Sequence, residues 1–384
     1  MSKRLIREIF VSLLILLFPF LAAHSAPPPQ SARWTEKAAS DWYAKQPWLV
    51  GSNYIPANAV NELEMWQAES FDPKRIDLEL GWAESIGLNT MRVFLHDLPW
   101  QQDPEGFRKR IDTFLQIAAK HHIRPLLVLF DSCWDPDPKL GKQRDPRPGV
   151  HNSGWVQSPG AKALQDPAQV PRLEKYVKGV VGVFANDPRI LGWDVWNEPD
   201  NGNGSELKDF KAETKTEIVL QLLPRAFEWA RAMHPTQPLT SGVWKGDWSG
   251  PEKLGPMEKI QIAMSDVISF HNYDKPEEFE KRVIWLQQFH RPILCTEYMA
   301  RGNGSTFQGT LPIARKYRVA AINWGFVAGR TQTYYPWDSW QHPYIDHQPA
   351  VWFHDIFRTA GEPYDKGEVA FIKEMVQSEN HAGQ

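Results

Sequence analysis

The sequence of 384 residues predicts an α/β fold, a (β/α)8 barrel of the TIM barrel type. Along the chain, a short apolar run, a polar loop and an amphipathic helical stretch follow one another repeatedly. The main alternative, a doubly wound open sheet, usually carries a glycine-rich phosphate turn after its first strand, whereas the first run here ends in GSNYIPAN. No linker interrupts the pattern, so we expect a single (β/α)8 barrel domain over residues 46–384.

The expected strands are short, and several are continuously apolar, as strands buried on both faces are. They cover Leu49–Tyr54, Asn89–Leu95, Arg124–Phe130, Ile190–Asn197, Pro238–Trp244, Asp266–Tyr273, Pro292–Tyr298 and Ala320–Val327.

Three of the intervening helices have clear starting signals. Asp72, Asp103 and Asp166 each precede a proline, which places a hydrogen-bond acceptor at the cap and proline at the first helical position. Apolar residues recur on one face behind each cap, and Gly87 is expected to end the first of these helices.

Two loops are long, residues 131–165 after the third strand and residues 328–348 after the eighth. In a barrel, both lie at the carboxyl ends of the strands, where active sites form. They are rich in Trp and Tyr, and tryptophan rings bind the flat apolar faces of sugars. We therefore expect them to form cleft walls; the alternative is packed surface loops.

The N-terminus has the order of a secretory signal. Lys3, Arg4 and Arg7 precede an apolar run at residues 9–23, and small residues follow. We expect residues 1–25 to be a signal peptide, residues 26–45 a short leader segment, and the protein to be exported to the periplasm or the extracellular space. An uncleaved anchor is the alternative, although the run is short for a membrane span.

The overall composition narrows the classes of partner. The formal net charge is −3, the pI is about 6.5 and no basic run is present, so no nucleic-acid partner is expected. No later segment is apolar enough to span a membrane, so no stable membrane partner is expected; the oligomeric state is open. Cys133 and Cys295 belong to opposite sides of the predicted barrel, beyond the ~7 Å Cα separation that a disulfide allows. We expect two free thiols, with Cys295 in the core.

Many polar side chains stand at the expected carboxyl ends of the strands, and a buried charge needs a partner or a function. Glu198 ends the fourth strand and Glu297 the seventh, so they face each other across the barrel mouth. Glycoside hydrolysis needs such a pair, one protonated to assist the leaving oxygen and one ionised to attack the anomeric carbon. For Glu198 alone, a structural ion pair is the alternative.

Five segments carry a specific resemblance. WDVWNEPD resembles the Asn-Glu-Pro segment of the clan-A retaining glycoside hydrolases, and ILCTEY resembles their nucleophile strand. FHNYD, MRVFLHD and AINWGF resemble their His-x-Tyr strand, second-strand Arg and eighth-strand Trp. The sequence is most similar to the cellulase-like glycoside hydrolase family 5, over roughly residues 50–327. The resemblance implies a retaining hydrolase, without cofactor or metal, that cleaves β-glycosidic bonds in oligo- or polysaccharides of the glucan, mannan or xylan type.

The resemblance also implies roles for single residues. Glu198 would be the general acid/base and Glu297 the nucleophile. Asn197 would bind the sugar 2-hydroxyl, His271 would lie beside Glu198, and Tyr273 would donate to Glu297. Two further residues complete the set: Arg92, which would keep Glu297 ionised, and Trp324, which would form the floor of the sugar site.

The sequence departs from the family pattern at the end of the third strand, where family 5 members often have a histidine. Here the strand ends in FDSCW, so either His96 with Asp97, or Asp131 with Trp134, would take over the sugar contacts. Trp337 in the last long loop is a further expected sugar contact.

Three other functions compete with this interpretation. An inactive or weakly active carbohydrate-binding barrel and a transglycosylase use the same residues. A metal-dependent hydrolase would draw on His96, Asp97, His121, His122 and His271. It is disfavoured because no His-x-His pair stands on an early strand, and because His121 and His122 precede the third strand, at the wrong end of the barrel.

Overall fold

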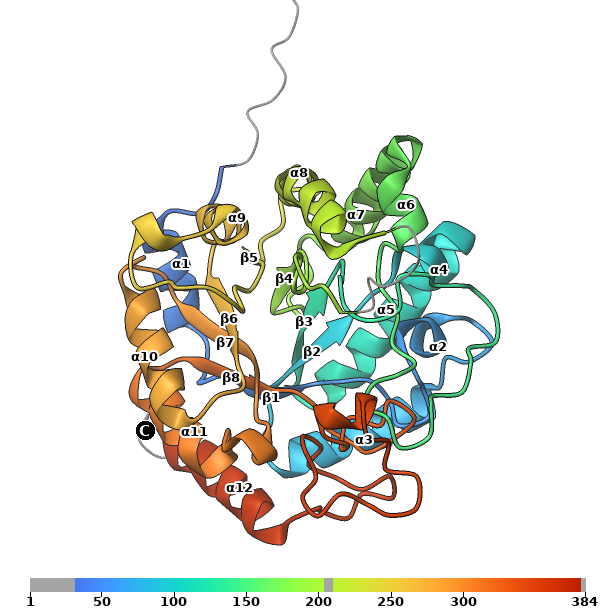
Figure 1. Cartoon of the computed structure of the whole chain (residues 1–384). Coiled ribbons are helices and arrows are strands. Elements are labelled where there is room, and N and C mark those ends of the chain that lie inside the picture. The colour runs from blue at the N-terminus through green and yellow to red at the C-terminus, as the bar shows by residue number, and fades with distance from the viewer. Residues whose placement is uncertain (1–31, 204–209, 381–384) are drawn as a thin grey trace, which may run out of the picture.

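A computed structural model describes residues 32–203 and 210–380, and its eight parallel strands form a barrel surrounded by helices (Figure 1). The hydrogen-bonded order is β5-β4-β3-β2-β1-β8-β7-β6. Each strand lies within a run predicted from the sequence, so the predicted fold is confirmed. The strands are β1 Val50–Asn53, β2 Thr90–Phe94, β3 Arg124–Val128, β4 Gly192–Asp194, β5 Leu239–Thr240, β6 Ile268–Asn272, β7 Ile293–Tyr298 and β8 Ala320–Asn323.

A short parallel bridge joins the two ends of this sheet. Val243, just beyond β5, pairs with Phe270 of β6. The amide of Val243 donates to the carbonyl of Ser269, and the amide of His271 donates to the carbonyl of Val243, both at 3.0 Å. Closure brings the carboxyl ends of β4, β6 and β7 around one opening.

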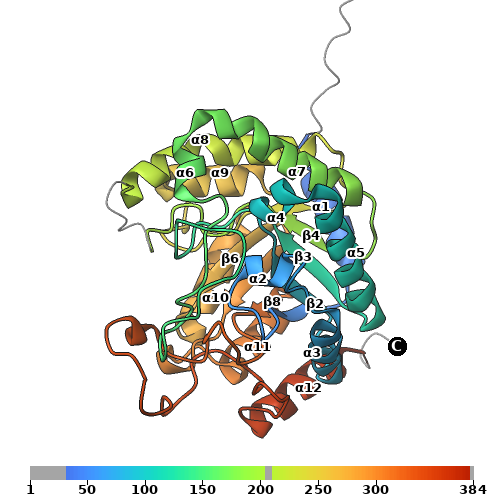
Figure 2. The same ribbon diagram turned by 90° about the vertical axis from the view of Figure 1, so that its right-hand side faces the viewer.

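Helices cover the outside of the barrel (Figure 2). Asp72 and Asp103 cap α3 and α5 as predicted, and Asp166 caps a 3-10 turn, Pro167–Gln169, that continues into α7. Gly87 follows α3 with a φ of 85°, which confirms the predicted helix stop. The helices are α1 Glu36–Ala44, α2 Glu62–Trp66, α3 Pro73–Ser85, α4 Asp97–Gln102, α5 Pro104–Lys120, α6 Ala161–Gln165, α7 Val170–Phe184, α8 Ala212–Arg231, α9 Pro256–Met264, α10 Pro276–Gln287, α11 Phe307–Lys316 and α12 Lys366–Asn380.

Helix α1 packs against the amino-terminal end of the barrel. Ala39 and Tyr43 form a buried cluster with residues at the starts of strands, among them Leu49 and Val267. Just before the helix, the side chain of Arg33 donates to carbonyls near the end of α9 at 2.7 Å. The folded unit therefore begins before residue 46, within the segment predicted as a leader, and the predicted signal peptide lies outside the described residues.

The two long loops pack against each other at the opposite end of the barrel. The first runs from the end of β3 to residue 160, just before α6, and the second from the end of β8 to α12, with a 3-10 turn at Trp337–Trp340. The amide of Asn152 donates to the carbonyl of Thr331 at 2.9 Å, and the amide of Tyr344 donates to the carbonyl of Gly149 at 3.0 Å. Segments far apart in the sequence thus form one continuous wall.

Both cysteines are buried free thiols, as predicted, and Cys295 belongs to the main hydrophobic core. Within the described residues, none of the helices combines the length and the apolar character needed to cross a membrane.

Candidate active site

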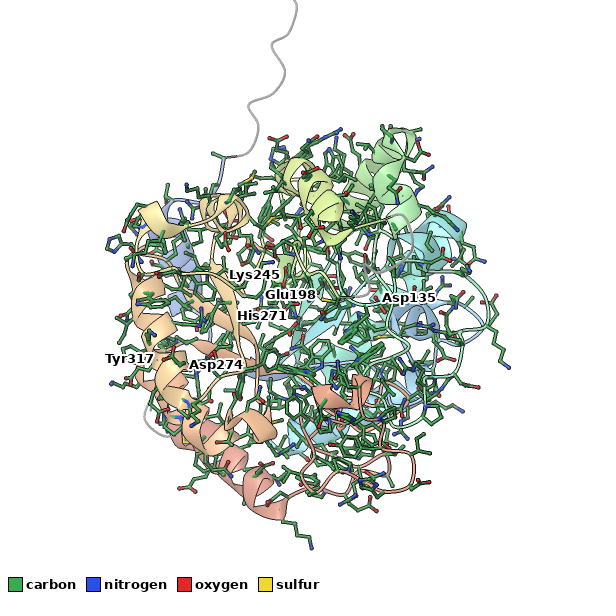
Figure 3. All side chains as sticks on the ribbon, in the orientation of Figure 1. Asp135, Glu198, Lys245, His271, Asp274 and Tyr317 are labelled. Carbon is green, nitrogen blue, oxygen red and sulfur yellow. The ribbon has the colours of Figure 1, made fainter. Side chains whose placement is uncertain are left out.

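A cavity of about 850 Å³ opens at the carboxyl end of the barrel. Glu198 and His271 lie near the centre of the molecule in Figure 3. The cavity wall includes eight of the predicted site residues, both glutamates among them, together with residues of the two long loops. The predicted residues that line it are Asp131, Trp134, Asn197, Glu198, Tyr273, Glu297, Trp324 and Trp337.

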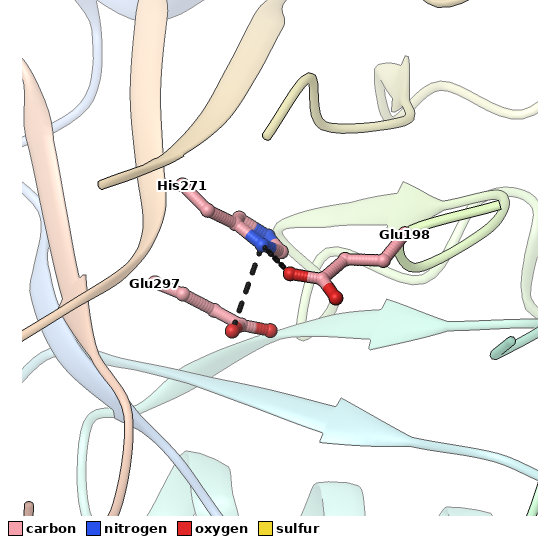
Figure 4. A group of neighbouring side chains, drawn as sticks. All are labelled: Glu198, His271 and Glu297. Carbon is pink, nitrogen blue, oxygen red and sulfur yellow. Dashed lines mark hydrogen bonds and ion pairs between the residues drawn. The ribbon is translucent and has the colours of Figure 1, made fainter. Parts of the chain in front are cut away.

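The two glutamates converge on the imidazole of His271 (Figure 4). His271 Nδ1 lies 2.8 Å from Glu198 Oε1 and 3.5 Å from Glu297 Oε2. One carboxylate oxygen of each glutamate and a ring nitrogen of His271 lie within 4.8 Å of one another. All three side chains are buried, at the ends of β4, β6 and β7.

Local backbone features direct these side chains into the cavity. Glu198 has a φ of 39°, in the left-handed region that non-glycine residues seldom adopt, and its carbonyl accepts from the amide of Asn201 at 2.8 Å. The β6–β7 register shifts after Phe270, so that His271 pairs with Glu297. Such an irregularity re-aims side chains next to functional sites.

Arg92 on β2 lies beneath Glu297 and is completely buried. Its Nη1 donates to Glu297 Oε1 at 2.7 Å and to Asn53 Oδ1 at 2.9 Å. Its Nη2 donates to Asp194 at 2.8 Å and to Asn197 Oδ1 at 2.7 Å. The guanidinium therefore fixes the nucleophile candidate and orients the side chain of Asn197 through charge-assisted bonds.

Glu297 also accepts a hydrogen bond from the hydroxyl of Tyr273 at 2.6 Å. Burial raises the pKa of the Tyr273 hydroxyl well above its usual range, so the hydroxyl keeps its proton and remains a donor. The neighbouring Arg92 and Tyr273 stabilise a negative charge on Glu297.

Glu198 is held by a different set of groups. Its Oε2 accepts from the side-chain amide of Asn201 and lies 3.4 Å from Cys133 Sγ. Within the described residues, Arg92 contacts Glu297 and not Glu198 directly. The acid/base candidate thus has neutral donors, whereas the nucleophile candidate has a cation.

Burial raises the pKa of both glutamates. At Glu198, the hydrogen bonds from Asn201 and Cys133 oppose this rise in pKa; at Glu297, His271 and Arg92 oppose it. Burial lowers the pKa of His271 to about 4, so its ring is neutral near pH 7. Of the two glutamates, Glu297 is the one that forms an ion pair with Arg92. We therefore assign the ionised state to Glu297 and the protonated state to Glu198.

Asp131 fixes the orientation of two side chains at the site, Asn197 and Trp155. Its Oδ1 accepts from the side-chain amide of Asn197 at 2.8 Å, and its Oδ2 accepts from the indole of Trp155 at 2.6 Å. With Arg92 on its oxygen and Asp131 on its nitrogen, the Asn197 amide has a fixed orientation. Its predicted contact with a sugar 2-hydroxyl stays a prediction.

His96 and Asp97 do not line the cavity. His96 caps α4 by accepting from the amide of Leu98, and Asp97 pairs with Arg172 of α7 at 2.6 Å. Burial opposes ionisation of Asp97, but His96 and Arg172 outweigh it and hold the pKa of this carboxyl well below its usual range. Of the two alternatives for the third-strand position, the structure brings only Asp131 with Trp134 to the cavity.

Aromatic rings form much of the cavity wall. Trp134 and Trp340, from the two long loops, stack with ring centroids 4.7 Å apart and planes 5° apart. Trp337 meets Tyr273 edge to face at 5.2 Å, and Trp324 packs edge to face against Trp155 at 5.8 Å. Flat apolar surfaces beside fixed polar groups are typical of sites that bind sugars.

Glu198, His271 and Glu297 have the spacing of a metal site. The charge of Glu297 is already balanced by Arg92 at 2.7 Å, and a cation at this point would face that guanidinium. The donor set therefore fits two carboxylates in different protonation states better than it fits a metal. His121 and His122 lie at the other end of β3, as the sequence predicted.

Several residues that reach the site were not predicted as members. Asn201 and Cys133 contact Glu198, and Asp194 pairs with Arg92. Asp194 could have been found from its alternation with Trp196 along the fourth strand. Cys133 and Asn201 carry no such signal, because irregular loops bring them to the glutamate.

Known proteins resemble the chain in structure and not in sequence. No family model matches, and no curated protein matches closely enough to count as a relative. A GH5_18 enzyme from Streptomyces cattleya in complex with Manb1-4GlcNAc superposes with a TM-score of 0.58, at 14% identity over 86% of this chain and 80% of that one. An exo-beta-1,4-mannosidase from Opitutaceae bacterium strain TAV5 gives 0.57, at 18% identity over 87% and 60%.

An endo-beta-1,4-mannanase from Thermotoga petrophila gives a TM-score of 0.55, at 13% identity over 89% of this chain and 79% of that one. Structural neighbours are therefore of the type that the sequence motifs resemble, glycoside hydrolase family 5. At these identities the likeness concerns the fold, and the chain has the (β/α)8 fold of these glycoside hydrolases.

Proposed function

We propose that the protein is a retaining glycoside hydrolase that cleaves β-glycosidic bonds in oligo- or polysaccharides. The observation that carries this proposal is the pair Glu198 and Glu297, with carboxylate oxygens within 4.8 Å and different electrostatic partners. Retaining enzymes place the two carboxyl groups about 5–5.5 Å apart, whereas inverting enzymes need ~6.5–9.5 Å to admit a water molecule. The observed spacing favours the retaining geometry.

The first step would form a glycosyl-enzyme. Glu297 Oε attacks the anomeric carbon while the bond from that carbon to the leaving oxygen breaks, and Glu198 transfers its proton to this oxygen. Glu198 Oε2 accepts from Asn201 and lies beside the Cys133 thiol, so Oε1, which faces His271, is the oxygen that carries the proton.

The second step would release the sugar. Glu198, now ionised, takes a proton from water, the water oxygen bonds to the anomeric carbon, and the bond to Glu297 breaks. Arg92 and Tyr273 stabilise the carboxylate that leaves, through the two hydrogen bonds to Glu297. The configuration at the anomeric carbon is retained after two inversions.

We propose β-mannosidic linkages as the first to test. The structural neighbours include enzymes described as mannanases and a mannosidase, and one is bound to Manb1-4GlcNAc. β-Glucan and xylan linkages remain within the same mechanism. An exported, periplasmic or extracellular location is likewise part of the proposal and rests on the N-terminal sequence alone.

The test compares wild type, Glu198→Ala and Glu297→Ala on aryl β-mannosides, β-glucosides and β-xylosides, with and without azide. Both variants should lose at least ~10³-fold in kcat on a substrate whose leaving group needs protonation. Azide should rescue them with opposite anomeric products, a β-glycosyl azide from the acid/base variant and an α-glycosyl azide from the nucleophile variant. Retained activity in Glu297→Ala would contradict the assignment, and binding of sugars without any turnover by wild type would favour a carbohydrate-binding barrel.

A further inference from the structure

The wall formed by the two long loops lies on one side of the glutamate pair. Gly149 and His151 of the first loop bond to the side chains of Gln332 and Ser339 of the second, and the backbone amide of Asn152 donates to the carbonyl of Thr331. The amide of Gly149 donates to Gln332 Oε1 at 3.0 Å, and the amide of His151 donates to Ser339 Oγ at 2.9 Å. His151 Nδ1 lies 2.9 Å from the carbonyl of Tyr335.

Close backbone packing reinforces this contact. Gly149 has a φ of 69°, and a Cβ placed on it would lie 2.4 Å from the backbone of Tyr344. Only glycine fits both the conformation and the approach. Trp134 and Trp340 stack across the same seam, with the guanidinium of Arg147 5.2 Å from the Trp340 ring.

The roles proposed for Glu198 and Glu297 determine how a substrate lies relative to this wall. The acid/base Glu198 must lie at the leaving oxygen, so the leaving group extends beyond Glu198. On that side the cavity reaches Trp244, whose indole donates to Asp200 at 2.8 Å, two residues after Glu198. The sugar that Glu297 attacks therefore lies on the other side, over Trp324 and toward the joined loops.

The wall contains a side-chain amide without a hydrogen-bond partner at the cavity. Asn152 lines the cavity, the residue is 1% exposed, and neither its Nδ2 nor its Oδ1 has a partner among the described residues. Buried amides without partners are rare because they cost about 1–3 kcal/mol each. A terminal sugar offers a free hydroxyl where an internal sugar has a glycosidic oxygen, and only the hydroxyl can donate to Asn152 Oδ1.

We propose that the joined loops close the cavity beyond the attacked sugar, so that the protein acts from the non-reducing ends of chains and not at internal bonds. Asn152 recognises the free hydroxyl of the terminal unit. This proposal rests on the proposed function and defines its substrate as a chain with an unblocked non-reducing end.

The test uses 4-nitrophenyl β-mannobioside, the corresponding cellobioside, and both compounds with a 4,6-O-benzylidene group on the terminal sugar. Wild type should hydrolyse an unblocked compound at least ~100-fold faster than its blocked form, because the wall leaves no room for the added ring. Equal rates, with internal cleavage products, would overturn the end-specific mode and leave hydrolysis intact. No turnover of any of the four compounds, together with no turnover of the aryl β-xylosides used above, would instead overturn the proposed function and this inference with it.

Variants of the wall sharpen the test. Gly149→Ala should push the loops apart and raise the rate on the blocked compound relative to the unblocked one. Gly141→Ala is the matched control: it lies in the same loop with a φ of 93°, but a Cβ there meets nothing within 4 Å. Gln332→Ala, which removes the bonds to Gly149 and Arg147 without a new Cβ contact, gives a second route to an opened wall. An unchanged ratio in both Gly149→Ala and Gln332→Ala would overturn the role of the seam.

Asn152→Gly removes the amide and keeps the left-handed backbone at φ 47°. It should lower kcat/KM on the unblocked compound by ~10-fold, mainly through KM, since one buried hydrogen-bond partner is lost. A variant with wild-type KM and kcat would contradict terminal recognition by Asn152.

Discussion

Replacing Arg92 by Met would leave two buried carboxylates without a cation. Arg92 donates to Glu297, Asp194, Asn53 and Asn197, and both it and Asp194 have no exposed surface. Removing one partner of a buried ion pair costs about 3–5 kcal/mol, whereas removing both can be neutral. We expect Arg92→Met to lower the free energy of unfolding by about 3–5 kcal/mol at pH 7, a large share of the ~5–15 kcal/mol typical of domains.

The pH dependence of this loss has a definite sign. Burial already raises the pKa of Glu297, and Arg92 opposes that rise, so its removal moves the folded-state pKa further above the unfolded value. A carboxyl with a raised folded pKa stabilises the fold below the unfolded pKa and loses this contribution as pH rises through the folded pKa. The deficit of Arg92→Met should therefore be larger at pH 8 than at pH 5.

Urea unfolding followed by tryptophan fluorescence at pH 5, 7 and 8 measures these differences. Arg92→Met combined with Asp194→Asn removes one of the two uncompensated charges and should recover part of the loss. A deficit under ~1 kcal/mol that does not change with pH would refute the description of Arg92 as the cation that balances both carboxylates.

Two further predictions concern single side chains. Cys133→Ala removes the thiol beside Glu198 Oε2, so the pKa of Glu198 should rise and the upper limb of the pH profile of kcat/KM should move to higher pH. Cys133→Ser keeps a donor and should resemble wild type, as should the core control Cys295→Ala. An unmoved upper limb in Cys133→Ala would exclude the thiol from positioning the acid. Burial raises the pKa of Asp355 to about 7, so its carboxyl stabilises the fold at low pH and loses that contribution between about pH 4 and pH 7. Asp355→Asn should therefore gain stability relative to wild type from pH 5 to pH 8, by up to about 1.4 kcal/mol for each unit between the folded and unfolded pKa. A difference in the free energy of unfolding between variant and wild type that stays constant with pH, measured by urea unfolding, would contradict this.

The sequence predicts the barrel well because each strand and each helix cap is a local signal. Asp72 and Asp103 need only the residues next to them to start a helix, and every strand of the barrel falls within a predicted apolar run. The glutamate pair is also predictable, because barrel geometry places the ends of β4 and β7 around one mouth.

Contacts between irregular segments could not be predicted from such local sequence signals. Asp97 follows a strand and was expected to face the sugar, but α4 begins at this residue and Arg172 of α7 takes its carboxylate. The stacking of Trp134 on Trp340 depends on the paths of two loops that have no periodic pattern. Local periodicity locates strand ends, whereas the loop conformations decide which of the polar groups there remain in the cavity.

The position of α1 determines the direction in which the cavity opens when the protein is attached to a partner or a support through its N-terminal side. Tyr43 and Ala39 seal the amino-terminal end of the barrel, and the side chain of Arg33, just before α1, is bound there too. The glutamates and the joined loops occupy the other end. A fusion partner, an affinity tag or a solid support joined directly at residue 32 would therefore lie at the closed end of the barrel, leaving the cavity turned outward and open to a polymer too large to diffuse around the protein.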